Sequence, residues 1–191
     1  MRRVLTVVAL LSILASPAFA HIGHGSTNSF VAGLVHPFGG LDHVVVMIMV
    51  GLWAGLKGGR AMWAWPLTFV GVMLIGGLMG MAHVSLPFVE PAIAASVIAL
   101  GLFIASALDV SVAAGAAIIA ACALFHGYAH GTEVTETTGG VEYLAGFALA
   151  TAGLHLVGIA FSLTMARFNL RPAVRVAGVL CVPLGVGLLL L

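Results

Sequence analysis

Charged residues are scarce in this chain, and their scarcity decides its class. Only 7% of the 191 residues are Asp, Glu, Lys or Arg, whereas 62% are hydrophobic, and the mean hydropathy is +1.21. A soluble domain usually carries about 25% charged residues, so this sequence cannot provide a water-facing surface of the required size. The net charge of +1 gives no electrostatic basis for binding nucleic acid.

The chain also lacks the common signatures of disulfide-rich and nucleotide-hydrolysing proteins. Its two cysteines, Cys122 and Cys181, both lie in apolar runs, and no CxxC pair occurs. The P-loop pattern G-x-x-x-x-G-K-[ST] is absent, which excludes ATP hydrolysis by that route. The zincin pattern H-E-x-x-H is absent too, because Gly127 follows His126. We therefore do not expect an enzyme.

The first 20 residues are typical of a secretory signal peptide. Two arginines follow Met1, Val4 to Leu14 form an apolar core, and Ala18-Phe19-Ala20 matches an A-x-A cleavage site. Cleavage would leave His21 as the mature N-terminus outside the cytoplasm, and export of this kind indicates a bacterial inner membrane. The alternative is an uncleaved anchor helix.

Residues 21–191 form one predicted domain, an all-α polytopic membrane bundle. A bilayer core of about 30 Å requires roughly 20 apolar residues per helix, and six stretches of about that length occur. They are Pro37–Leu56, Ala61–Met81, Pro91–Leu108, Val110–His130, Val141–Leu163 and Ala173–Leu191. The break between the third and fourth stretches is very short, so we expect Asp109 to cap the following helix.

Charge distribution predicts how the six spans are oriented. If His21 is external, the loops after the first, third and fifth spans face the cytoplasm. Those loops hold every basic residue of the mature chain: Lys57, Arg60, Arg167, Arg171 and Arg175. This is the arrangement that the positive-inside rule requires. Most acids lie near the opposite, external ends: Asp42, Glu90, Glu133, Glu136 and Glu142. Both mature termini are therefore predicted to be periplasmic.

Small and aromatic residues carry structural expectations. Glycines along the second span should allow close approach between helices; they are Gly71, Gly76, Gly77 and Gly80. Tryptophans flank the first cytoplasmic loop and are expected to be interfacial anchors; they are Trp53, Trp63 and Trp65.

Histidines and carboxylates within the spans carry the expected chemistry, because ionisable residues in a membrane are costly and usually functional. His36 and His43 are seven residues apart and share a helix face, unless Gly39 and Gly40 interrupt the helix. Asp42 is either a ligand or a hydrogen-bond acceptor that orients a ligand imidazole.

The fourth span presents His126, His130 and Glu133 on one face, at positions i, i+4 and i+7. Imidazole suits Zn, Cu, Fe and Ni, and carboxylate adds compensating charge. We expect this group and the first-span group to converge in the outer part of the membrane; the alternative is a structural polar network. His155 lies deeper, as a second station for an ion or as an interhelical hydrogen-bonding group.

Two runs at these positions resemble known signatures. HPFGGLDH, from His36 to His43, resembles the first-helix signature H-x5-D-H of the HupE/UreJ family. FHGYAHGTE, from Phe125 to Glu133, resembles the fourth-helix signature F-H-G-x-A-H-G-x-E of that family, and His155 fits its fifth helix.

The resemblance implies a nickel permease, or an accessory protein, that supplies hydrogenase or urease through downstream nickel-insertion proteins. Some family members are associated with cobalt instead. It implies no prosthetic group, since the divalent ion is the cargo, and it implies six functional positions: His36, Asp42, His43, His126, His130 and Glu133. The alternatives are a cobalt permease, and a membrane metal-binding accessory protein or metalloenzyme that does not translocate.

Overall fold

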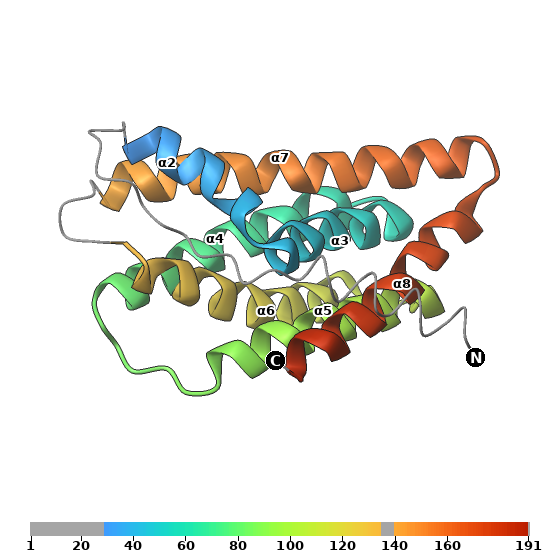
Figure 1. The fold of residues 1–191 in the computed structure, drawn as a ribbon. Helices are drawn as coiled ribbons and strands as arrows, with labels where there is room; N and C mark the ends of the chain where they lie inside the picture. The colour runs from blue at the N-terminus through green and yellow to red at the C-terminus, as the bar shows by residue number, and fades with distance from the viewer. Residues whose placement is uncertain (1–28, 135–139, 191) are drawn as a thin grey trace.

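The described part of the protein is entirely helical. The computed structural model describes residues 29–134 and 140–190 and contains no strand within them (Figure 1). Its elements are α2 (Ser29–Val35), the 3-10 helix η1 (His36–Gly39), α3 (Leu41–Lys57), α4 (Ala61–Met81), α5 (Val89–Ser106), α6 (Val112–Thr132), α7 (Gly140–Arg167) and α8 (Arg171–Leu189). The predicted signal peptide, residues 1–20, and Glu136 lie outside the described residues.

The helices confirm a polytopic membrane bundle. Helices α4 to α8 are each long and apolar enough to cross a membrane. The segment of α2 and η1, Ser29–Gly39, and the helix α3, Leu41–Lys57, together make a sixth span if they count as one bent span. The first span differs from the predicted continuous helix starting at Pro37, because the chain turns by 88° at Gly40. Gly40 has extended dihedral angles, φ −121° and ψ 123°, which end the helical hydrogen bonding there.

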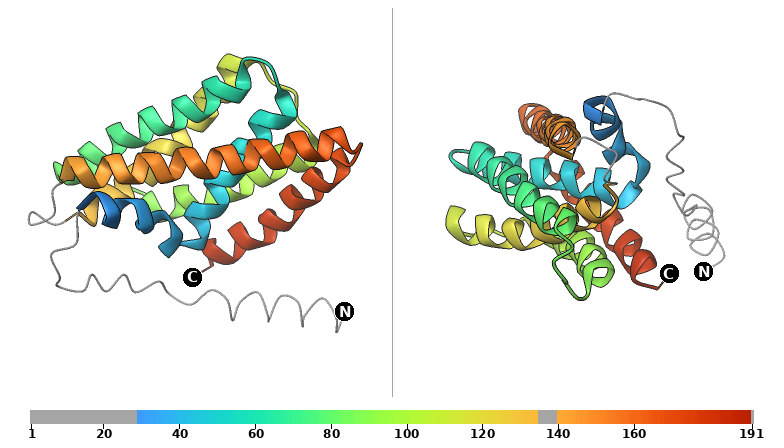
Figure 2. Two further views of the ribbon diagram at one scale, coloured as in Figure 1. Left: turned by 90° about the horizontal axis from the view of Figure 1, so that it is seen from above. Right: turned by 90° about the vertical axis from the view of Figure 1, so that its left-hand side faces the viewer.

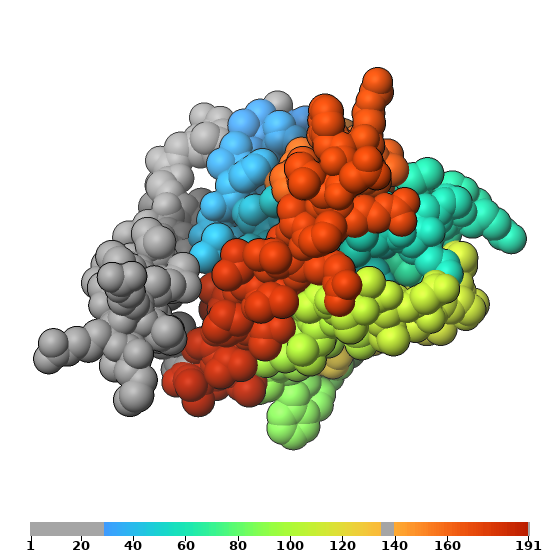
Figure 3. All heavy atoms as spheres, turned by 90° about the vertical axis from the view of Figure 1, so that its right-hand side faces the viewer, coloured from blue at the N-terminus to red at the C-terminus, as the bar shows by residue number. Residues whose placement is uncertain are grey.

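Neighbouring helices pair in a fixed pattern. Helix α4 packs mainly on α6, α5 on α8, and both α2 and α3 on α7, which runs the length of the bundle (Figures 1 and 2). The α3–α4, α5–α6 and α7–α8 connections lie together at one end of the molecule (Figure 3). That end therefore carries the basic residues of the described chain, as the predicted orientation requires.

Glycines allow α4 and α6 to touch backbone to backbone. A Cβ atom added to Gly127 would lie 2.0 Å from the Met73 carbonyl oxygen, and one added to Gly131 would lie 2.1 Å from that of Gly77. The expectation for α4 is confirmed at Gly76, Gly77 and Gly80, each with α6 or α7 atoms nearby, but not at Gly71, which has none within 4 Å. Helix α6 is thereby fixed with His126 and His130 buried.

The expectation that three tryptophans anchor the interface is wrong for two of them. Trp53 and Trp65 are 1% and 0% exposed, and their rings pack at 4.4 Å between centroids. Each indole N–H donates to a carbonyl near the junction of α5 and α6, Trp53 to Leu108 in the connection at 3.4 Å and Trp65 to Val112, the first residue of α6, at 2.9 Å. A buried indole N–H requires such an acceptor, and these two carbonyls supply it.

The expected N-cap role of Asp109 is also wrong. Ser111 caps α6, since its hydroxyl accepts a hydrogen bond from the Ala114 amide at 3.1 Å. Asp109 instead forms an ion pair with Lys57 at the end of α3. Val110 and Ser111 separate Asp109 from the start of α6, so its side chain lies too early to cap that helix and instead pairs with the neighbouring connection.

The backbone contact between α4 and α6 predicts a stability difference between two glycines. Gly127→Ala places a methyl group against an immobile carbonyl, and overpacking of this kind costs about 1–3 kcal/mol or more. We expect its apparent melting temperature in detergent to fall by about 2 °C or more. Gly71→Ala, with open space around it, should leave the temperature unchanged or raise it. Equal effects of the two substitutions would contradict the packing described.

Candidate metal site

The turn at Gly40 brings the two histidines of the first span to a single histidine of α6. His36, in η1, lies 4.7 Å from the His130 ring, and His43, in the first turn of α3, lies 4.1 Å from it, both measured between ring centroids. The seven-residue spacing predicted that His36 and His43 share one face of a continuous helix. They lie close together for a different reason: the bent backbone places both on the same side of α6.

Helix α6 supplies the other half of the cluster. His126 and His130 lie one turn apart and are 0% and 4% exposed, and the His126 ring lies 5.0 Å from that of His43. Glu133 follows the helix as its C-cap, and its Oε2 lies 2.8 Å from His36 Nε2 and 3.6 Å from His130 Nδ1. The first-span and fourth-span groups thus converge.

Three of these side chains offer ligand atoms in a metal-binding arrangement. One ligand atom each from His36, His130 and Glu133 lies within 4.8 Å of the others. Ligand atoms held at about 2.1 Å from one ion lie about 3 to 4 Å apart, so small side-chain movements would close the set. Two imidazoles and one carboxylate suit a divalent first-row transition metal.

Asp42 orients His43 toward this centre. His43 Nδ1 lies 2.7 Å from Asp42 Oδ1. An ionised carboxylate only accepts hydrogen bonds, so Nδ1 carries the hydrogen and donates it, which leaves the Nε2 lone pair free. His43 Nε2 is buried and has no hydrogen-bond partner within the described chain. Asp42 therefore has the geometry of a residue that positions a ligand.

Ser96 orients the His126 ring as Asp42 orients His43, and no sequence feature indicated this role. The Ser96 hydroxyl lies 2.6 Å from the Ile93 carbonyl, to which it donates its only hydrogen, and 2.9 Å from His126 Nε2. His126 Nε2 must then donate to Ser96, leaving the Nδ1 lone pair free. A single serine in an apolar helix carries no functional signal in sequence, so only the packing of α5 against α6 reveals this role.

Unpaired imidazole nitrogens gather in the cluster. His126 Nδ1, His43 Nε2 and both ring nitrogens of His130 are buried without a hydrogen-bond partner in the residues described. Buried polar groups are normally paired, and a cation bound among these neighbouring rings would satisfy nitrogen atoms that the described chain leaves unpaired. The alternative of a purely structural polar network explains these atoms poorly, because such a network would pair them.

Glu133 provides a fixed negative charge at the solvent-exposed edge of the histidine cluster. Burial alone would raise the pKa of the Glu133 carboxyl, but the imidazoles of His130 and His36 outweigh burial and hold that pKa well below its usual range. The side chain is half exposed and ionised at neutral pH. It can therefore attract a cation from the aqueous phase.

His155 lies apart from the cluster of His36, His43, His126 and His130, in the buried part of α7. Its ring contact among the described residues is Phe69, at 5.1 Å, and Phe69 also lies 6.1 Å from the His126 ring. Both nitrogens of His155 lack a hydrogen-bond partner in the described structure. This disfavours the alternative that His155 serves an interhelical hydrogen bond, and leaves the second-station hypothesis in place.

The geometry predicts which carboxylates matter for metal affinity. Asp42→Ala removes the acceptor that orients His43, and Glu133→Gln removes the charge of a ligand; each should weaken Ni²⁺ binding about 10- to 100-fold, as measured by calorimetry on the purified protein. Glu142→Gln alters an exposed acid at the start of α7 and should bind normally. Unchanged affinity in both cluster variants would contradict the site.

Comparison with known proteins agrees with these motifs. The family model described as HupE / UreJ protein matches residues 8–188. Protein HupE of Rhizobium leguminosarum bv. viciae is 42% identical over 175 residues, covering 90% of this chain and 91% of that protein. No solved structure matches the chain. With a family model spanning nearly the whole sequence and a relative of this identity, the chain belongs to the HupE/UreJ family.

Proposed function

We propose that the protein is a bacterial inner-membrane permease that imports Ni²⁺ for the maturation of a hydrogenase or urease. The observation that carries the proposal is the convergence of imidazoles from the first span with His130 and Glu133 of the α6 end. Nickel is the cargo that the resemblance to the family implies. Cobalt is the alternative, because affinity order alone does not separate the two at such a site.

The proposed path starts at the rim of the cluster. Glu133 attracts the hydrated ion, which exchanges water for imidazole nitrogens of His36, His43 and His130. The ion then moves inward past Phe69 to His155, which lies about 22 Å along α7 from Gly140 at 1.5 Å per residue. Two separated stations of moderate affinity suit a pathway better than one closed cage, since conduction requires that the ion also leave.

The membrane potential is sufficient to drive this movement. An interior-negative potential contributes about 2.3 kcal/mol per elementary charge per 100 mV, and a divalent ion gains twice that amount. We therefore propose facilitated diffusion, or coupling to an ion gradient. The clustering of basic residues at the opposite end of the bundle supports an orientation with that end in the cytoplasm and both mature termini outside. Cytoplasmic nickel-insertion proteins would then receive the ion.

Nickel uptake into proteoliposomes with an imposed interior-negative potential tests the proposal. Wild type and Glu142→Gln should accumulate labelled Ni²⁺ in the lumen, whereas His130→Ala should fall to the level of empty liposomes. His155→Ala should retain binding at the outer cluster but lose accumulation, because the cluster does not include it. Saturable binding by wild type without luminal nickel would overturn the permease and favour a non-translocating accessory protein.

A further inference from the structure

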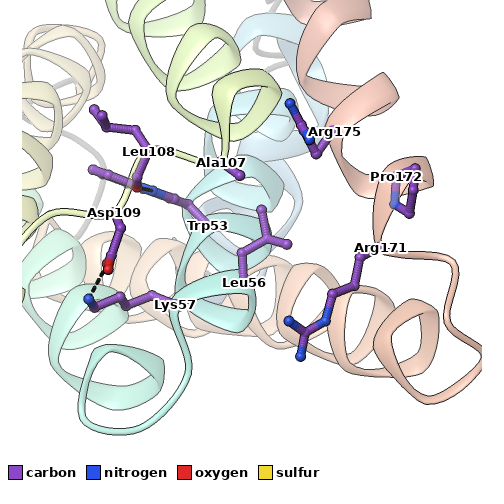
Figure 4. Close-up of a pocket in the computed structure, with 9 residues that line it drawn as sticks. All are labelled: Trp53, Leu56, Lys57, Ala107, Leu108, Asp109, Arg171, Pro172 and Arg175. Atoms are coloured by element: carbon purple, nitrogen blue, oxygen red, sulfur yellow. Dashed lines mark hydrogen bonds and ion pairs between the residues drawn. The ribbon is translucent and has the colours of Figure 1, made fainter.

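A pocket opens at the basic end of the bundle, far from the histidine cluster. Its volume is about 430 Å³, and it lies between the ends of α3, α5 and the start of α8. Lys57 and Asp109 stand on one side, Arg171 and Arg175 on the other, with Trp53 and Leu56 between them (Figure 4). The histidine cluster lies near the opposite end of α6, a helix of 21 residues that is about 30 Å long.

The pocket has more positive charge than its own acid can neutralise. Three cations line it against one carboxylate, and that carboxylate, Asp109, is paired with Lys57. Arg175 uses its Nε to donate to the Ala105 carbonyl at 2.8 Å, which fixes its guanidinium in place. Arg171 is exposed and has no protein partner within the described structure. Two guanidinium groups therefore remain available to an anion.

The remaining walls are apolar. Leu56, Leu108 and Pro172 line the pocket beside Trp53, and α8, which carries both arginines, exposes further apolar side chains along its length, among them Val176, Val179 and Leu180. A ligand that matches this surface has an anionic head and an apolar body. Basic pockets between membrane helices on the cytoplasmic side are suited to anionic lipid headgroups, and guanidinium binds phosphate through paired hydrogen bonds.

We propose that this pocket binds the phosphate of an anionic phospholipid from the cytoplasmic leaflet, with Arg171 as the phosphate-binding residue and Arg175 adding positive charge on the same side of the pocket. The site is independent of metal transport, since none of its residues belongs to the histidine cluster. Bound lipid would also hold the α3, α5 and α8 ends together, because the pocket is built from all three.

Lipid binding to the purified full-length protein tests the proposal by native mass spectrometry. Wild type should retain phosphatidylglycerol in preference to phosphatidylcholine. Arg171→Gln should weaken phosphatidylglycerol binding about fivefold, the effect of one basic residue at a lipid surface. Arg171→Lys keeps the charge but loses the paired hydrogen bonds, so it should bind phosphatidylglycerol less tightly than wild type and more tightly than Arg171→Gln. Arg167→Gln, a basic residue of the same end that does not line the pocket, is the matched control and should bind as wild type does.

Several outcomes would overturn the assignment. Equal losses in Arg167→Gln and Arg171→Gln would show a diffuse surface-charge effect, and equal retention of the two lipids by wild type would remove the anionic preference. Full displacement of lipid by inorganic phosphate at the same concentration would identify a small-anion site rather than a lipid site. Because Arg171 has no protein partner among residues 29–134 and 140–190, its variants should show wild-type melting temperatures in phosphatidylcholine, which separates binding from folding.

Discussion

The meeting of His36 and His43 with His130 is the interaction on which the site depends. Imidazoles are poorly accommodated in an apolar bundle unless their nitrogens are paired or bind a cation. Here the turn at Gly40 delivers two of them to one face of α6, with Glu133 closing the rim. A straight first helix would keep the two rings seven residues apart along its axis, about 10 Å, and they could not both contact His130.

Close helix packing elsewhere in the bundle keeps these histidines next to one another. Gly127 and Gly131 lie between and beside the histidines of α6 and allow α4 to pack directly on that helix. Gly51 of α3 and Gly158 of α7 do the same for the first span, because a Cβ on either would lie within 2.2 Å of a carbonyl of the other helix. The hydrophobic effect does not drive helices together in a membrane, because lipid tails are as apolar as leucine. Close packing at small residues stabilises helix association there instead.

Much of this arrangement could be predicted from the sequence, and the failures have physical reasons. Hydropathy and charge indicated the long spans, and the spacing of His126 and His130 correctly predicted that they lie one turn apart on α6, although Glu133 lies just past the end of that helix. The turn at Gly40 could not be predicted, because paired glycines permit both a helix and a break. The buried positions of Trp53 and Trp65, and the contact of Ser96 with His126, depend on which helices become neighbours, and local sequence does not encode that.

X-ray absorption at the nickel edge of the Ni²⁺-loaded protein tests most directly whether the bent span and α6 share one ion. The convergence predicts a shell of nitrogen and oxygen ligands with scattering from at least two imidazole rings, and one ring fewer in His130→Ala. A shell of oxygen alone that does not change in that variant, or a sulfur ligand, would contradict it.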